Sequence, residues 1–194
     1  MKATSLLQEQ HRHVEQLFDE LEKGQDASLL RELANVLSAH MAIEQNIFYP
    51  AVREADPELI DESYQEHAMA ELALKRLLAV EPRDPTFNAR MTTLEDLILN
   101  HVDEEENQLF PSVERKMDAE LLESLGDQLE QAFLDAKAEG FDALVPSTFA
   151  RTSADEALAS LWAEPSSQNA EQAPQKDDDG SGLQTWPEQA VHRH

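Results

Sequence analysis

One short pattern occurs twice in this chain and constrains its fold more than any other feature. Both copies read H-x-x-x-E-x-x-x-x-x-P-x-V, the first beginning at His40 and the second at His101. A spacing of four residues places the histidine and the glutamate of each copy on the same face of an α-helix. The glutamates are Glu44 and Glu105. The repeat therefore predicts two helices that each present an imidazole and a carboxylate side by side.

The apolar residues around each copy predict that this shared face is buried. An α-helix turns about 100° per residue, which places Glu44 about 40° from His40 and Glu105 about 40° from His101. Leucines and isoleucines occupy the same arcs: Leu33, Leu37 and Ile47 on the first helix, and Leu94, Leu97 and Ile98 on the second. Burial of an isolated carboxylate is strongly unfavourable unless a cation or hydrogen-bond donors compensate it. Both glutamates therefore point to a buried cation.

Two further histidines lie on apolar faces of earlier segments. His11 aligns with Val14 and Phe18, and His67 lies among Ile60, Tyr64, Leu74 and Leu78. A single histidine in such a place is typical of a hydrogen-bonded core residue. Four imidazoles and two carboxylates at one level of a bundle instead indicate a shared metal site. The predicted ligands are His11, His40, Glu44, His67, His101 and Glu105, whereas His13 is predicted to face solvent.

Two other glutamates also follow a histidine by four residues. Glu71 lies four residues after His67, within the same apolar arc, and Glu15 lies four residues after His11, at the edge of its stripe. In a chain so rich in glutamate some of these spacings are expected by chance. Glu71 is the stronger of these two additional candidates.

Helical periodicity runs through the first 139 residues, without the alternation typical of strands. We expect helices over residues 4–24, 27–49, 57–80, 87–117 and 118–138, with Pro50 ending or bending the second and Pro111 bending the fourth. Ser5 and Gln8 have the spacing of a capping box at the start of the first helix. Short loops between long helices favour an up-down-up-down antiparallel four-helix bundle with an extra C-terminal helix.

The chain is expected to divide into three parts. Residues 1–140 would form the bundle and the fifth helix, and residues 141–162 a partly helical extension. Residues 163–194 are rich in Ser, Gln, Pro and Asp and nearly free of large apolar residues. Such a composition buries too little apolar surface to offset the entropy of ordering, so we expect a disordered acidic tail.

Composition excludes several classes of function. The formal net charge is −25, from 15 Lys and Arg against 40 Asp and Glu. Such a surface repels phosphate backbones and anionic lipids, so neither nucleic acid nor membrane is an expected partner. The absence of cysteine excludes disulfides, thiolate metal sites and cysteine nucleophiles. The chain begins with nothing that resembles a signal peptide, and no apolar run approaches the roughly 20 residues of a membrane span, so a cytoplasmic location is expected.

The predicted ligand set also narrows the choice of metal. Imidazole and carboxylate without sulfur suit iron or manganese, and suit zinc less specifically. Six ligands are too many for one closed structural zinc site and too few to saturate two octahedral ions. If both glutamates bridge two ions, coordination positions remain open for an oxygen bridge and a small ligand.

Several of these residues carry a resemblance to a known family. The matching stretches are Gln10-His11-Arg12, His40 to Glu44 with Phe48-Tyr49-Pro50, Glu66-His67, and Asn100 to Glu105 with Phe110-Pro111. Over residues 4–138 the chain resembles the hemerythrin-like (HHE) cation-binding family. The resemblance implies a four-helix bundle around two non-haem Fe ions, oxo- or hydroxo-bridged. It implies that the four histidines are terminal ligands and that Glu44 and Glu105 are bridges.

The chain differs from the oxygen-carrying hemerythrins at two positions. Those proteins have a second histidine one turn after the first on the third helix, where this chain has Glu71. They also have an aspartate one residue after Glu105, where this chain has Glu106. The pattern is more similar to the branch of the family that includes iron-centre repair proteins and iron or oxygen sensors.

Three functional hypotheses follow. The first is a di-iron protein that engages O₂, NO or peroxide for sensing, detoxification or iron and oxygen handling. The second is an enzyme with peroxidase-like or NO-reductase-like activity at the same site. The third is an interaction domain in which the metal only stabilises the fold. Under the first two, Glu71 and Tyr64 are candidates to tune the open coordination position.

Overall fold

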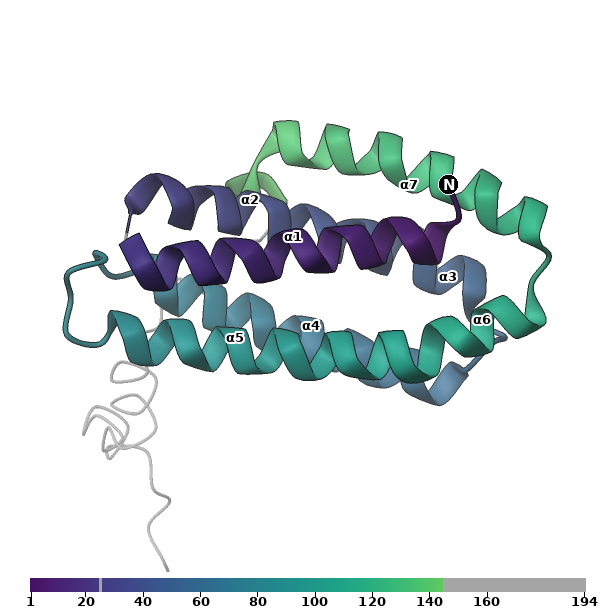
Figure 1. Cartoon of the computed structure of the whole chain (residues 1–194), viewed down its shortest axis with the longest axis horizontal. Coiled ribbons are helices and arrows are strands. Elements are labelled where there is room, and N and C mark those ends of the chain that lie inside the picture. Colours follow the sequence, from purple (N-terminus) through teal and green to yellow (C-terminus); the bar gives the residue numbers. More distant parts are fainter. Residues whose placement is uncertain (25, 145–194) are drawn as a thin grey trace, which may run out of the picture. The chain divides into compact units, whose positions relative to one another are not determined.

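The computed structural model describes residues 1–24 and 26–144, and all the regular structure in that part is helical. Four long helices form the bundle: α1 (Ala3–Gly24), α2 (Ala27–Ile43), α4 (Pro57–Leu78) and α5 (Phe87–Glu104). They run alternately up and down, so the predicted antiparallel bundle is confirmed (Figure 1). The expected acidic tail at 163–194 and the extension beyond residue 144 lie outside the described residues.

A fifth long helix, α7 (Ala119–Glu139), packs along α1 and α2 (Figure 1). It approaches the chain's first residues so closely that a Cβ atom on Gly126 would lie 2.1 Å from the Met1 carbonyl oxygen. The helix ends at Gly140, whose φ of 82° suits glycine far better than any other residue. A single turn, α8 (Phe141–Leu144), follows.

The start of the first helix differs from the prediction. Helix α1 begins at Ala3, so Ser5 lies within the helix and not at its N-cap. The Thr4 hydroxyl donates a hydrogen bond to the Glu114 carboxylate across the bundle, at 2.6 Å. A tertiary contact therefore extends the helix past the local capping signal. Among the described helices, none combines the length and apolar character that a bilayer crossing requires.

Each copy of the repeated motif contains a π-helical turn that the sequence reading did not predict. Helix α2 passes into η1 (Glu44–Phe48) and then α3 (Tyr49–Val52). Helix α5 passes into η2 (Glu105–Leu109) and then α6 (Phe110–Lys116). The backbone N–H that follows each turn donates to the carbonyl of its glutamate, five residues back. The proline next along the chain has no N–H to donate, which favours a break in the α-helical ladder at this point.

The π turns change which residues face the interior. In an ideal α-helix, Tyr49 would lie about half a turn from His40 and would face outward. A π turn takes up one additional residue, so the helix beyond it is rotated by about 100° relative to that expectation. Tyr49 is consequently fully buried, and Phe110, at the matching place in the second copy, is 2% exposed.

The core consists of two apolar clusters. One contains Val14, Leu37, Met41, Ile98 and Val102 among others, and the second contains Leu7, Ile43, Phe48, Ile60 and Leu109. On α1, α2, α4 and the continuous segment α5–η2, the histidine that belongs to the centre falls between residues of the two clusters. The polar site is therefore enclosed by apolar side chains on both sides along the bundle axis.

Candidate metal centre

Six buried polar residues meet inside the bundle. Each long helix contributes one histidine, and the first residue of each π turn contributes a glutamate. None of the six is more than 3% exposed: His11, His40, Glu44, His67, His101 and Glu105. The structure thus brings together all six predicted ligand residues, and their role as metal ligands stays a prediction.

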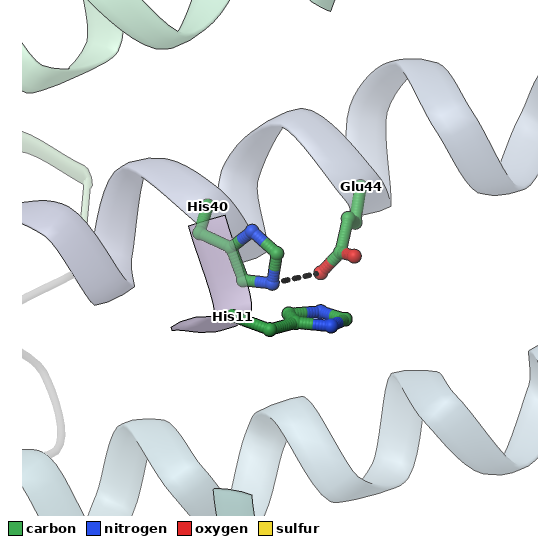
Figure 2. A group of neighbouring side chains, drawn as sticks. All are labelled: His11, His40 and Glu44. Atoms are coloured by element: carbon green, nitrogen blue, oxygen red, sulfur yellow. Dashed lines mark ion pairs between the residues drawn. The ribbon is translucent and has the colours of Figure 1, made fainter. Parts of the chain in front are cut away.

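Glu44 lies between two histidines from different helices. Its Oε2 atom is 3.2 Å from His40 Nε2 and 3.4 Å from His67 Nε2. Figure 2 shows the Glu44 carboxylate turned toward the His40 ring, with the His11 ring beside it. The rings of His11 and His40 are in edge contact, with centroids 4.8 Å apart. The carboxylate of Glu44 is therefore placed to serve both sides of the site.

Glu105 occupies the corresponding place on the opposite side. Its Oε2 atom is 3.3 Å from His11 Nε2 and 3.6 Å from His101 Nε2. The rings of His67 and His101 have centroids 4.6 Å apart, and their Nε2 atoms are 3.0 Å from one another. Each glutamate thus connects one histidine of the first pair with one of the second pair.

The donor atoms form two overlapping groups. One consists of His11, His40 and Glu44, and the other of Glu44, His67 and His101, and within each group one ligand atom per residue lies within 4.8 Å of the others. We call these the His11/His40 position and the His67/His101 position. Because Glu44 belongs to both groups, the geometry suits two cations that share a carboxylate.

Each of the four histidines of the centre has a hydrogen-bonding partner at Nδ1. The pairs are His11 with Glu106 at 2.8 Å, His40 with Gln10 at 2.8 Å, His67 with Gln45 at 3.1 Å and His101 with Glu66 at 2.7 Å. These contacts leave each Nε2 atom directed at the centre. Acceptors such as Glu106, Gln10 and Glu66 fix the ring orientation of metal-ligating histidines and raise their basicity, whereas the Gln45 side-chain amide nitrogen donates to His67 Nδ1.

Several atoms of the centre have no hydrogen-bond partner within the described structure. They are His11 Nε2, both carboxylate oxygens of Glu44, and Glu105 Oε2. Buried polar groups in folded proteins are nearly always paired, because an unpaired one loses its hydration without compensation. Unpaired acceptor atoms that converge at one point are what a pair of bound cations would satisfy. The residues present therefore fit such a pair.

The electrostatics of the two glutamates are unequal when no cation is considered. Burial, together with the charge of Glu105, raises the pKa of Glu44 well above its ordinary value. Burial acts on Glu105 in the same direction, but the neighbouring His101 and His11 outweigh it and hold the pKa of Glu105 below its usual range. Two carboxylates this close resist ionising together without positive charge between them.

Two of the histidines, His40 and His67, are favoured in the neutral form, which is the form that binds metals. Burial, reinforced by the neighbouring imidazoles, lowers the pKa of His40 and of His67 well below the ordinary value. His101 differs, because the carboxylates of Glu105 and Glu66 outweigh burial and raise its pKa. A cation at this position would compete with that proton.

Tyr49 and Phe110 occupy matching positions after the two π turns but contribute different chemistry. The Tyr49 hydroxyl donates to Glu105 Oε1 at 2.9 Å and lies 3.2 Å from His67 Nε2. The Phe110 ring instead stacks on His11, with centroids 5.8 Å apart and planes inclined by 8°. A phenol therefore lies at the His67/His101 position and a plain ring at the His11/His40 position.

Other glutamates considered from the sequence lie outside the two groups. Glu71 is half-exposed and, among the described residues, belongs to neither. Glu106 reaches His11 Nδ1 rather than the centre, and Glu15 forms a salt bridge with Arg12. His13 is exposed, as predicted.

The hydroxyl of Tyr64 is directed away from the centre. It donates to the Gln45 carbonyl at 2.9 Å, an oxygen inside the first π turn. The tyrosine whose hydroxyl reaches the predicted ligands is therefore Tyr49. A small cavity of about 10 Å³ adjoins all four histidines and is otherwise lined by Val14, Leu37, Met41, Ile98 and Val102.

Comparison with known proteins agrees with this geometry. The family model described as hemerythrin HHE cation binding domain matches residues 2–113. A DNA nickase from Nostoc sp. is 28% identical over 140 residues, which are 68% of this chain and 39% of that protein. This chain thus spans about two fifths of the length of that relative.

The fold has a counterpart among solved structures. The crystal structure of a hemerythrin HHE cation binding domain-containing protein from Mycobacterium kansasii superposes with a TM-score of 0.65. The match covers 72% of this chain and 89% of that one, at 24% sequence identity, which supports likeness of fold. Because the family model matches more than half of the residues, the chain belongs to the hemerythrin HHE cation-binding domain family.

Proposed function

We propose that this protein holds two non-haem iron ions at the centre and engages a small ligand there, namely O₂, NO or peroxide. The function would be sensing, detoxification or the handling of iron and oxygen. The observation that carries the proposal is the convergence of four Nε2 atoms on two carboxylates, several of whose oxygens are otherwise unpaired. The nitrogen and oxygen donor set, free of sulfur, is one that suits iron.

The surroundings of the centre favour a very small ligand. The adjoining cavity has a volume of about 10 Å³ and an apolar lining. That space is close to the volume that one water molecule needs. The small, apolar cavity excludes bulky substrates. A diatomic molecule or a peroxide is therefore the ligand that it favours.

The histidines and their partners would determine how iron behaves there. The carboxylates of Glu66 and Glu106 accept hydrogen bonds from imidazole N–H groups, which strengthens those imidazoles as donors. Bound iron would supply redox chemistry and open coordination positions. The chain's own contribution is to hold the donors and to keep water away through Val14, Leu37 and Ile98.

The activity named for the Nostoc relative is not part of this proposal. The similarity covers 39% of that protein, and nucleic-acid cleavage requires a surface that tolerates phosphates. A formal net charge of −25 opposes that requirement.

Anaerobic reconstitution with Fe(II) tests the proposal. We expect two iron ions per chain, and an absorbance spectrum that changes when oxygen and then azide are added. Glu44→Ala removes the carboxylate common to both positions, so it should lower the iron content below two per chain. His13→Ala is the matched control, because His13 is an exposed histidine on the same helix as His11.

The same samples separate the three hypotheses. Consumption of peroxide or NO with an added reductant would favour the enzyme, whereas a ligand-sensitive spectrum without turnover would favour a binding or sensing role. A large iron-dependent rise in melting temperature without a ligand-sensitive spectrum would favour the stabilising metal. Failure to retain iron at all would contradict the proposal.

A further inference from the structure

The two cation positions are built to the same plan. Each contains one histidine held at Nδ1 by a glutamine and one held by a glutamate. At the His11/His40 position the holders are Glu106 and Gln10, and at the His67/His101 position they are Glu66 and Gln45. Glu44 and Glu105 each contact one histidine of either position. The positions differ in the amide atom that their glutamine presents, in Tyr49 against Phe110, and in what surrounds the two outer glutamates.

At the His11/His40 position the outer carboxylate is Glu106, which also pairs with the positively charged side chain of Arg12. Glu106 Oε1 accepts hydrogen bonds from His11 Nδ1 and from the Arg12 guanidinium. Arg12 also donates to Glu15 Oε1 at 2.7 Å, so its charge is held in place beside the position. The positive charge of Arg12 offsets the negative charge of Glu106 and opposes the binding of another cation nearby.

The outer carboxylate of the His67/His101 position has the opposite surroundings. Glu66 accepts from His101 Nδ1, and in the described part of the chain no Lys or Arg forms a salt bridge with it. Glu104 lies close enough to Glu66 and to Glu62 for their charges to interact, and the charges of Glu66 and Glu104 both act on His101. Negative charge thus accumulates behind His101, where it favours a cation at the centre.

We propose that the two positions fill in a fixed order, with the His67/His101 position binding the first cation and the His11/His40 position the second. The proposal rests on the proposed function, since it requires that two cations bind. Charge repulsion between two neighbouring cations weakens the second step in any dinuclear site. The proposal goes further, because it states which position is filled first and attributes the order to Glu66 and Arg12.

A titration with Co(II), whose absorbance reports its coordination, tests the order. We expect two steps per chain. Glu66→Gln should weaken the first step by about 10- to 100-fold, as loss of an outer partner typically does. Its matched variant, Glu106→Gln, should leave the first step unchanged and weaken only the second. Arg12→Gln should strengthen the second step about two- to fivefold, the size expected for one exposed charge.

Single-position variants identify each step. His11→Ala should retain the strong step and lose the weak one, and His101→Ala should do the reverse. Tyr49→Phe makes the two positions alike after their π turns and should preserve the order. Circular dichroism of each metal-free variant confirms that it is folded.

Each result decides the question. Two steps that respond equally to Glu66→Gln and Glu106→Gln would overturn the order while leaving two-metal binding intact. The order would also be overturned if His11→Ala removed the strong step, or if Tyr49→Phe abolished the difference between the two steps. Absence of any Co(II) or Fe(II) binding in the unmodified protein would instead contradict the proposed function.

Discussion

The two helix pairs of the bundle differ in what lies over their outer faces. Helix α7 packs along α1 and α2, with Leu122, Leu125 and Leu129 buried. Along the α4/α5 pair, by contrast, runs an open groove of about 450 Å³ beside Met69 and Leu72, which are 53% and 38% exposed. Two pairs with the same role at the centre thus have different outer surfaces.

Helix α2 is apolar on more than one face, because α7 covers its outer side. Every residue from Val36 to Met41 is buried, because the helix contacts the bundle on one side and α7 on the other. From Ser63 onward, helix α4 buries residues only at spaced positions, such as His67, Ala70 and Leu74. A helix that is apolar all round is buried all round, whereas a single stripe marks a helix with one covered face. The stability of the α1/α2 pair is therefore expected to depend on α7.

The largest expected effect comes from weakening the contact of α7. Leu129 is fully buried in an apolar cluster with Leu7 and Ile43. Leu129→Ala should lower the free energy of unfolding by about 2–5 kcal/mol, because it removes buried methyl groups and leaves a cavity. Urea denaturation monitored by circular dichroism measures the change.

Leu72→Ala is the matched control on the open pair. Leu72 is 38% exposed beside the groove, so its truncation should change the free energy of unfolding by about 0.5 kcal/mol or less. Equal losses for the two leucines would remove the distinction between the covered pair and the open pair.

The next effect concerns how closely α7 approaches the start of the chain. A Cβ atom on Gly126 would lie 2.1 Å from the Met1 carbonyl oxygen and 3.0 Å from the Ala3 nitrogen. Gly126→Ala should therefore destabilise the protein by about 1–3 kcal/mol, despite the better helix propensity of alanine. A thermal melt of the variant checks this expectation.

Gly24 provides the comparison. A Cβ atom there would meet nothing within 4 Å, so Gly24→Ala is expected to be neutral or slightly stabilising. If Gly126→Ala were equally harmless, α7 would not be held against the first residues as closely as the structure indicates.

The smallest effect is expected from removing a helix N-cap. Because caps act locally, this effect should not depend on the covering helix α7. The Asp26 side chain accepts hydrogen bonds from the Ser28 N–H at 2.7 Å and from its hydroxyl at 2.8 Å, and these lower the pKa of Asp26 below 3.8. The stabilisation by this cap is therefore present above pH 3.8 and is lost as the pH falls through the lower folded-state pKa. Asp26→Ala should lower the melting temperature at pH 7, and the deficit should shrink as the pH falls below 3.8.

Asp56 caps α4 on the open side, accepting from the Leu59 N–H at 3.3 Å. We expect Asp56→Ala to lower the melting temperature at pH 7 to a similarly small extent. A much larger loss for either cap would show that the covering helix influences more than apolar packing.

Much of the fold was predictable because the helices depend on local patterns. Helix α4 starts at Pro57, as expected, and α7 ends at Glu139, one residue beyond the expected 138. The first helix begins one residue earlier than expected, where Thr4 bonds to Glu114, a partner 110 residues away. Contacts of that range leave no mark in a local pattern.

The centre was predictable to the extent that one helical face determines it. His40 and Glu44 lie on the same face of one helix, His101 and Glu105 lie on the same face of another, and all four residues are buried. The outer partners were missed, because Gln10 and Glu106 are ordinary polar residues until the bundle sets them beside a histidine from another helix. The paired prolines were the one local signal for the π turns.

Tyr49 illustrates how a local irregularity defeats a regular count. Counted at α-helical spacing, it faces away from His40, yet its hydroxyl reaches Glu105 and His67. With one additional residue counted in the π turn at Glu44–Phe48, Tyr49 falls on the interior face.

The π turns also determine how this segment tolerates change. From Glu44 to Pro50 the spacing, more than the identity of the side chains between, decides whether Tyr49 and Val52 reach the interior. Substitutions at solvent-facing Asn46 leave that spacing intact, whereas the loss of a single residue would turn everything downstream by about 100°. Natural variation in this stretch is therefore expected to exchange exposed residues such as Asn46 freely and to conserve its length.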